Sequence, residues 1–78
     1  MKELLYAIVV GLVEDVSGIE ITQDEPNAEG VIVLHLHVAE NDMGRVIGKQ
    51  GRIAKAIRTI MRSGATRKGI DAVAVEIG

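Results

Sequence analysis

Two glycines, Gly48 and Gly51, interrupt a stretch that otherwise has the periodicity of a helix, and this break constrains the fold more than any other feature of the sequence. A short helical segment through residues 45–47 precedes the break, and a longer one from about 52 to 63 follows it. Glycine has no Cβ and permits a sharp reversal of the backbone. The sequence therefore predicts two consecutive helices joined by a tight Gly48–Gly51 loop.

The ends and faces of these helices can also be predicted. Asn41 and Asp42 are favourable N-cap residues for the short helix, and Gly64 is expected to end the long one. Residues 65–70 then read as a basic loop. Within the long helix, the apolar face expected in the core consists of Ile53, Ala56, Ile57, Ile60 and Met61, and the polar stripe away from it consists of Arg52, Lys55, Thr59 and Arg62.

The rest of the chain predicts one more helix and three strands. The helix covers residues 2 to about 16 and stops near Gly18, and the strands cover 19–25, 31–39 and 71–77, with a turn at 26–30. In the second strand, Ile32, Leu34, Leu36 and Val38 share one face, and Val31, Val33, His35 and His37 share the other; in the third, Val73, Val75 and Ile77 point inward. The order predicts one α+β domain over residues 1–78, with three helices on one face of a three-stranded sheet.

The charges are strongly segregated along the chain. The net charge is −2, which by itself argues against a nucleic-acid partner. However, eight of the nine basic residues lie between Gly44 and Gly69, and that window contains no acid, whereas eight of the eleven acids lie in the first forty residues. A ligand responds to the local field rather than to the average of the chain. The basic window is therefore expected to attract an anionic partner.

The composition limits the other kinds of site. There is no cysteine, so neither a disulfide nor a cysteine-based zinc site is available. His35 and His37 have a spacing compatible with a metal but no third ligand nearby, which favours ordinary packing in a strand. The apolar run at residues 4–13 is followed by Glu14 and Asp15 without a cleavage pattern, which favours a cytoplasmic protein without membrane insertion.

The string Val46-Ile47-Gly48-Lys49-Gln50-Gly51-Arg52-Ile53 resembles the KH-domain signature, in which a GxxG loop joins two helices. An extra helix and strand ahead of the core resemble the bacterial type II arrangement. The longer string GRVIGKQGRIAKAIR is similar to the small stand-alone bacterial KH-domain proteins of the KhpA family. The resemblance implies binding of single-stranded RNA, and either a homodimer or a pairing with a larger KH-domain protein of the KhpB or Jag type.

The residues of the loop also carry a physical argument for RNA binding. Glycines let a sugar-phosphate chain come close, and the N-terminus of the following helix favours an anion. Cationic side chains can hold phosphates, and apolar ones can form a groove for bases. The predicted RNA-binding residues are Gly48, Lys49, Gln50, Gly51, Arg52 and Lys55, with Arg45, Val46, Ile47 and Ile53 beside them. The roles of Arg58, Arg62, Arg67 and Lys68 stay open.

Several alternatives compete with this interpretation. A nucleotide-hydrolase phosphate loop fails because Gln50 stands where Ser or Thr should hold magnesium. A DNA-binding helix-turn-helix over residues 43–63 would need a helical bundle around it. An enzyme has no support, since no nucleophile–base pair and no paired carboxylates lie near the loop. The main alternative is a KH fold that acts in dimerisation or scaffolding, which the 47% hydrophobic content favours.

Overall fold

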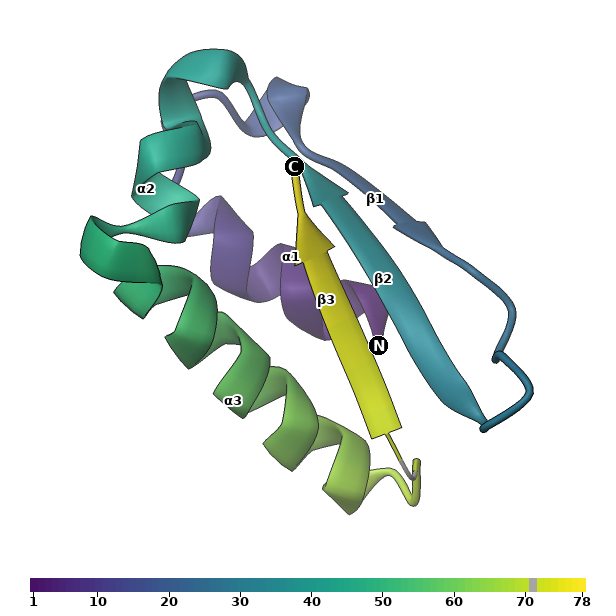
Figure 1. Ribbon diagram of the computed structural model, residues 1–78. Coiled ribbons are helices and arrows are strands. Elements are labelled where there is room, and N and C mark those ends of the chain that lie inside the picture. Colours follow the sequence, from purple (N-terminus) through teal and green to yellow (C-terminus); the bar gives the residue numbers. More distant parts are fainter. Residues whose placement is uncertain (71) are drawn as a thin grey trace.

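The computed structural model describes residues 1–70 and 72–78, in which helices cover one face of a mixed three-stranded sheet (Figure 1). The helices are α1 (Lys2–Val10), α2 (Met43–Ile47) and α3 (Arg52–Arg67), and the strands are β1 (Glu20–Gln23), β2 (Val31–His37) and β3 (Ala72–Ile77). Short 3-10 turns occupy Val16–Gly18, Glu40–Asp42 and Lys49–Gly51. The predicted α+β fold and its order of elements are therefore confirmed. The predicted last strand included Asp71, which lies outside the described residues.

The sheet has the strand order β1-β2-β3. β1 and β2 form the predicted hairpin and are antiparallel, with Glu20 opposite His37. β2 and β3 are parallel, with Leu36 opposite Ile77. Parallel neighbours need a long crossover connection, and α2 and α3 supply it. The break between these two helices thus lies within the crossover.

The core lies between the sheet and the helices. Leu34, Leu36 and Val38 are buried and Ile32 is half-buried, which confirms the alternation predicted for the second strand. The other large side chains in the buried cluster are Leu5 and Val9 of α1, Val46 of α2, Ile57 and Met61 of α3, and Val75 of β3. Every helix therefore contributes to one continuous core.

The first helix ends at Val10, earlier than the predicted residue 16. The N–H groups of Leu12 and Val13 both bond to the Val9 carbonyl, so the last turn closes there. The next amides, at Glu14 and Asp15, bond to the side chain of Asp42 instead of continuing the helix. The periodicity of the sequence continues beyond residue 10, but a distant carboxylate takes the hydrogen bonds that a longer helix would need.

The third helix continues through Gly64 to Arg67, so the prediction that Gly64 ends it is wrong, and much of the predicted basic loop is helical. Gly64 lies close to α1: a Cβ there would lie 2.5 Å from Cδ2 of Leu4, so that side chain would have to shift. The helix ends at Arg67; Gly69 follows with φ +74°, and the Ile70 N–H bonds back to the Ala65 carbonyl. This is the left-handed glycine C-cap expected of a helix end.

The buried face of α3 also differs from the prediction. Ala54, Ile57, Met61 and Ala65 are buried, whereas Ala56 is exposed and Ile60 is 46% exposed. Ile60 is therefore a surface residue, not a core residue. None of the helices in residues 1–70 and 72–78 has the length and apolar character that a membrane-crossing segment requires.

Candidate nucleic-acid interface

The loop between α2 and α3 is a sharp break in the backbone. Gly48 ends α2 with φ +73° and ψ 176°, a conformation that is essentially restricted to glycine. Gln50 (φ +56°) and Gly51 (φ +75°) follow in left-handed conformations. Gln50 is the one non-glycine residue with positive φ among the residues that the structure describes. The predicted interruption is therefore present, with three of its four residues at positive φ.

Gly48 lies directly against Ile53 of α3. A Cβ on Gly48 would clash with Cγ1 and Cβ of Ile53 and lie only 3.0 Å from its backbone nitrogen. At Gly51 a Cβ would meet nothing within 4 Å. The first glycine is thus required by packing and conformation together, and the second by conformation alone.

Some of the backbone N–H groups of the Gly48–Gly51 loop are already hydrogen-bonded within the loop. The Gly51 N–H bonds to the Gly48 carbonyl at 3.3 Å, and the Arg52 N–H bonds to the Lys49 carbonyl. The amide of Arg52, at the N-terminus of the long helix, is therefore occupied. The amides of Lys49 and Gln50 are the next candidates for a ligand.

The predicted site residues separate into exposed and buried groups. The side chains of Lys49, Gln50, Arg52 and Lys55 are exposed, and Ile47 is 40% exposed. Ile53 is half-buried beneath Gly48. Val46 does not wall a surface groove, as the sequence suggested, because its side chain is fully buried in the core. The apolar surface beside the loop consequently depends on Ile47.

Arg45 lies in a different environment from the other predicted cations. Its Nη2 donates to Oε1 of Glu14 at 2.7 Å, and its Nε lies 3.2 Å from Oδ1 of Asp42. Asp42 is fully buried, and its two oxygens accept the N–H groups of Glu14 and Asp15. These hydrogen bonds hold the pKa of Asp42 below its usual value. Sequence reasoning treated Asp42 as an N-cap and missed this arrangement.

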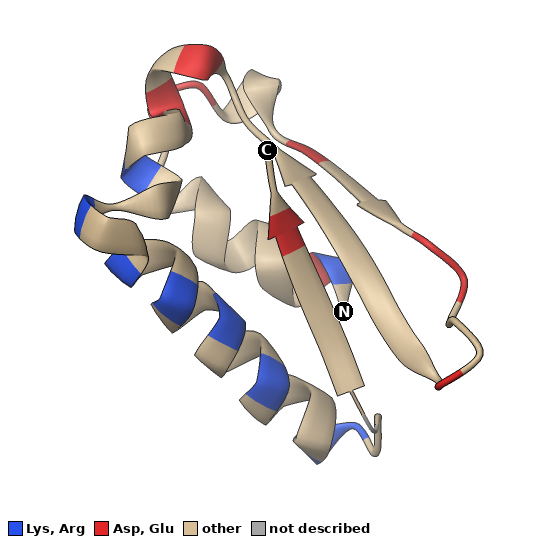
Figure 2. Cartoon of the chain, in the orientation of Figure 1, with Lys and Arg blue, Asp and Glu red and all other residues tan. Residues whose placement is uncertain are grey.

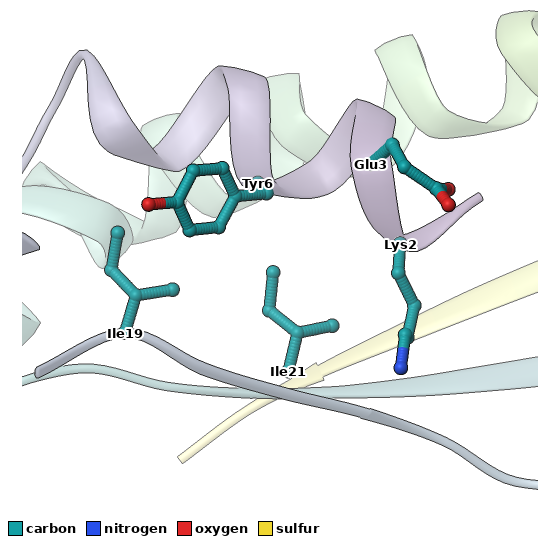
Figure 3. Close-up of a pocket in the computed structure, with 5 residues that line it drawn as sticks. All are labelled: Lys2, Glu3, Tyr6, Ile19 and Ile21. Carbon is teal, nitrogen blue, oxygen red and sulfur yellow. The ribbon is translucent and has the colours of Figure 1, made fainter. Parts of the chain in front are cut away.

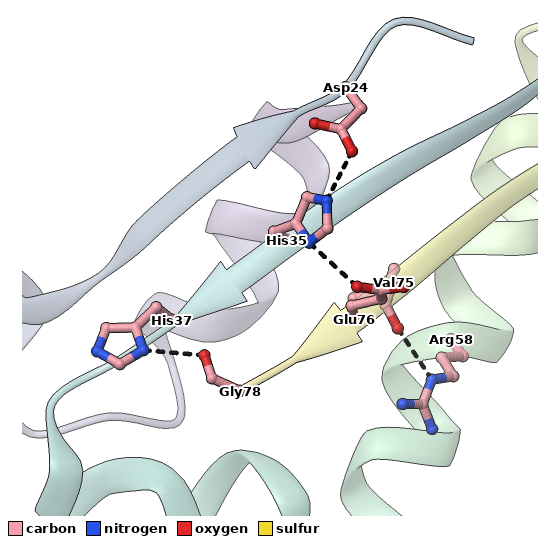
Figure 4. A network of polar contacts seen from close by, with 7 residues as sticks. All are labelled: Asp24, His35, His37, Arg58, Val75, Glu76 and Gly78. Carbon is pink, nitrogen blue, oxygen red and sulfur yellow. Dashed lines mark hydrogen bonds and ion pairs between the residues drawn. The ribbon is translucent and has the colours of Figure 1, made fainter. Parts of the chain in front are cut away.

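The basic residues that follow the loop form an exposed strip along α3, with acids mostly on other elements (Figure 2). Within the described residues, none of these side chains has a carboxylate within 4.0 Å: Lys49, Arg52, Lys55, Arg58, Arg62, Arg67 and Lys68. Arg58 instead bridges to the sheet, where its Nε donates to the Val75 carbonyl at 3.2 Å (Figure 4). The strip can therefore direct its positive charge to a ligand.

The helix-free face of the sheet carries a separate polar network (Figure 4). Nε2 of His35 lies 2.8 Å from Oδ2 of Asp24, and Nδ1 lies 3.2 Å from Oε2 of Glu76. The hydrogen bond to Asp24 is the main cause that raises the pKa of His35. His37 donates from Nδ1 to the Gly78 carbonyl at 2.9 Å. Across residues 1–70 and 72–78, no group of three His, Asp or Glu side chains is arranged to hold a metal ion.

An apolar pocket of about 360 Å³ lies between α1 and β1, on a surface that the sequence did not single out (Figure 3). Its walls are formed by Tyr6, Ile19 and Ile21, with Lys2 and Glu3 at one end. Tyr6 is the sole aromatic residue of the chain and is 44% exposed. The one Phe, Tyr or Trp ring of the chain thus belongs to α1 and is not part of the Gly48–Gly51 loop.

The whole chain is similar to known KH-domain proteins. The model of the family described as "KhpA/KhpB, KH domain" matches residues 2–77. "RNA-binding protein KhpA" of Clostridium acetobutylicum is 47% identical over 77 residues, which is 99% of each chain. The protein of the same name from Listeria monocytogenes is 49% identical over 61 residues, which is 78% of each chain.

Solved structures support the same fold at lower identity. Era in complex with MgGDPNP and nucleotides 1506–1542 of 16S ribosomal RNA matches 96% of this chain with a TM-score of 0.69 and 20% identity. A point variant of Aquifex aeolicus Era bound to GDP·AlF4⁻ matches 97% with a TM-score of 0.65 and 19% identity. The matched regions are 28% and 30% of those longer chains. At this identity the likeness concerns the fold alone.

Proposed function

This chain belongs to the KhpA/KhpB KH-domain family, and from that premise we propose that it binds single-stranded RNA at the Gly48–Gly51 loop. The observation that carries the proposal is the position of the loop. A backbone break with little side-chain bulk opens directly onto a helix whose exposed cations have no carboxylate partner among the described residues. The relatives that carry the name RNA-binding protein KhpA support RNA binding as such.

The contacts follow from the chemistry of the exposed groups. Phosphates are held by the ammonium of Lys49 and by Arg52 and Lys55 in the first turns of α3, where the helix dipole also favours an anion. The amides of Lys49 and Gln50 supply further donors. Ile47, at the end of α2, offers apolar surface to an unstacked base. No step of this proposal is catalytic.

The expected affinity is modest. A KH loop clamps about four nucleotides. Non-specific binding of this electrostatic kind has a Kd of roughly 10⁻⁴ to 10⁻⁶ M at physiological salt. Since Tyr6 is not part of the loop, aromatic stacking contributes nothing there and sequence specificity is low. Weak, unspecific binding suits an RNA chaperone or a post-transcriptional regulator with many targets.

The direct test replaces the two exposed residues of the loop by acids. Asp tolerates the left-handed conformation of Gln50, so the Lys49→Asp/Gln50→Asp variant is expected to fold normally. Its affinity for an unstructured fluorescein-labelled 12-nucleotide RNA should fall at least tenfold, measured by fluorescence anisotropy. Lys2→Asp/Gln23→Asp is a matched control, because it makes the same two changes at exposed positions on α1 and β1. Equal binding by the loop variant and the parent would refute the site.

We also propose that the chain self-associates, which adds avidity to a weak single site. The supporting observation is exposed apolar surface: Ile60 is 46% exposed and lies beside a groove of about 440 Å³ between α1 and α3. The same surface suits a larger KH-domain partner. In sedimentation velocity the parent should form a dimer that Ile60→Asp dissociates. A parent that sediments as a monomer at high protein concentration would exclude self-association.

A further inference from the structure

Asp42 connects two segments that are far apart in the sequence. Its carboxylate is fully buried and accepts the N–H of Glu14 at 3.1 Å and that of Asp15 at 3.0 Å. It stands at the N-cap position of α2, yet its side chain makes no capping bond to that helix. The side chain thus fastens the start of α2 to the segment that follows α1. We call Glu14, Asp15, Asp42 and Arg45 the Asp42 clasp.

A helix as short as α2 needs such support. It has five residues, far fewer than the roughly 12 at which isolated helices become even marginally stable. Val46, near its C-terminal end, is buried in the core, and Gly48 beyond that end packs on Ile53. The clasp holds the remaining, N-terminal end. Because the last residue of α2 precedes Gly48, the orientation of α2 sets the position of the loop.

The contacts of Arg45 match this role better than a contact with phosphate. Its guanidinium lies within 3.2 Å of two carboxylates, Glu14 and Asp42, so the local charge around it is not positive. The cations at Lys49, Arg52 and Lys55 have no such partners among the described residues. Two of the three guanidinium nitrogens of Arg45 already lie against carboxylates, so an RNA phosphate there would have to compete with Glu14 and Asp42. It meets no such competitor at the other three cations.

We propose that Asp42 and Arg45 are positioning residues for the RNA loop, and that Arg45 is not itself a phosphate ligand. The inference rests on the proposed function of the loop. It revises the role that the sequence suggested for Arg45, from an RNA contact to a residue that fixes the position of the loop. It also explains why the only arginine of α2 is turned toward the 14–15 segment.

The salt dependence of RNA affinity distinguishes a positioning residue from a phosphate ligand. Each phosphate contact with a single strand contributes about 0.7 to the slope of log K against log salt. Lys49→Met removes a proposed contact, so this slope should become shallower by about 0.7. Arg45→Met should raise the Kd for the 12-nucleotide RNA about threefold to tenfold, as expected for a residue that acts through another, and leave the slope unchanged. If the slope of Arg45→Met falls as it does for Lys49→Met, the inference is wrong.

Arg45→Lys provides a second discriminating variant. Lysine retains the charge but not the planar fork that reaches Glu14 and Asp42 together. If Arg45 positions the loop, Arg45→Lys should lose as much RNA affinity as Arg45→Met. If its charge only attracts phosphate, Arg45→Lys should bind RNA like the parent. Parental affinity in Arg45→Lys, combined with weak binding by Arg45→Met, would overturn the inference.

Spectra of the RNA-free chain test the clasp independently of RNA. In a ¹⁵N-labelled sample, Arg45→Met should shift the amide resonances of Gly48 and Gly51 while those of β2 stay in place. Unchanged loop resonances would contradict the clasp. If these shifts occur but Lys49→Met binds RNA like the parent, the clasp stands and the proposed RNA site fails, so the two failures are distinguishable.

Discussion

The glycines of the loop illustrate how similar residues meet different physical demands. Gly48 has a conformation that is almost exclusive to glycine and lies against Ile53, whereas Gly51 has a left-handed conformation and open space around it. The sequence indicated that both positions need glycine, because their spacing marks a break between helices. It could not indicate the contact with Ile53, since a close approach depends on how α3 returns past the loop.

This difference predicts unequal costs for the same substitution. Gly51→Ala should lower the free energy of unfolding by roughly 1–2 kcal/mol, the cost of a left-handed alanine. Gly48→Ala adds a steric clash to backbone strain of about 1–3 kcal/mol and should destabilise more. Urea unfolding of both variants measures the two costs. Equal losses would show that Ile53 moves aside without cost.

At the scale of elements, the sequence predicted what each segment is but not where two helices end. Local patterns identified the three α-helices and the three strands, because most of the apolar side chains that recur along them pack into the core. They did not identify the short 3-10 helices. Asp42 accepts the amides that a longer α1 would need, and α3 passes through Gly64 where it lies against Leu4 of α1. Both are contacts between distant parts of the chain, and a local pattern does not contain them. Ile60 is exposed because the buried face of α3 consists of Ala54, Ile57, Met61 and Ala65.

The sheet carries a testable pH dependence at His35, which lies between Asp24 and Glu76 (Figure 4). The pKa of His35 is raised above its ordinary value of 6.5. Protonated His35 therefore stabilises the folded state. Its contribution to the free energy of unfolding is complete below pH 6.5 and is lost as pH rises through the folded-state pKa. Melting temperature should fall modestly from pH 6 to pH 8.5.

His35→Gln should reduce that fall in melting temperature, because it removes the group that titrates between the two carboxylates. His37→Gln is the matched control on the same strand face and should retain most of the fall. A parent whose melting temperature rises over this interval, or a His35→Gln variant that retains the full dependence, would contradict the role of His35.

At the scale of the whole molecule, the segregation of charge matters more than its sum. The net charge is −2, yet the exposed strip along α3 is cationic (Figure 2). The sequence indicated this segregation because the basic window coincides with one helix. It left open which cations matter, since that depends on distance from the loop and on partners such as Glu14. Lysine and arginine near Gly51 are expected to contribute more than those near the C-terminal end of α3.

Paired charge reversals test whether the contribution of the cations to RNA binding decreases along α3 with distance from the loop. Arg52→Glu/Lys55→Glu should weaken RNA binding strongly, because both residues follow the loop directly. Arg62→Glu/Arg67→Glu makes the same change in net charge further along the helix and should have a smaller effect. Anisotropy titrations at one salt concentration compare the two variants. A larger loss from the distal pair would move the site toward the pocket formed by Arg62, Ala65 and Val73.

The most direct test of the central claim is to map the RNA contact on the parent chain by ¹⁵N–¹H correlation spectra during titration with the unstructured 12-nucleotide RNA. The account predicts that the largest shifts occur at residues 47–55, which comprise the loop and the first turn of α3. Shifts concentrated on the helix-free face of the sheet around His35, or at the pocket between α1 and β1 around Tyr6, would contradict it.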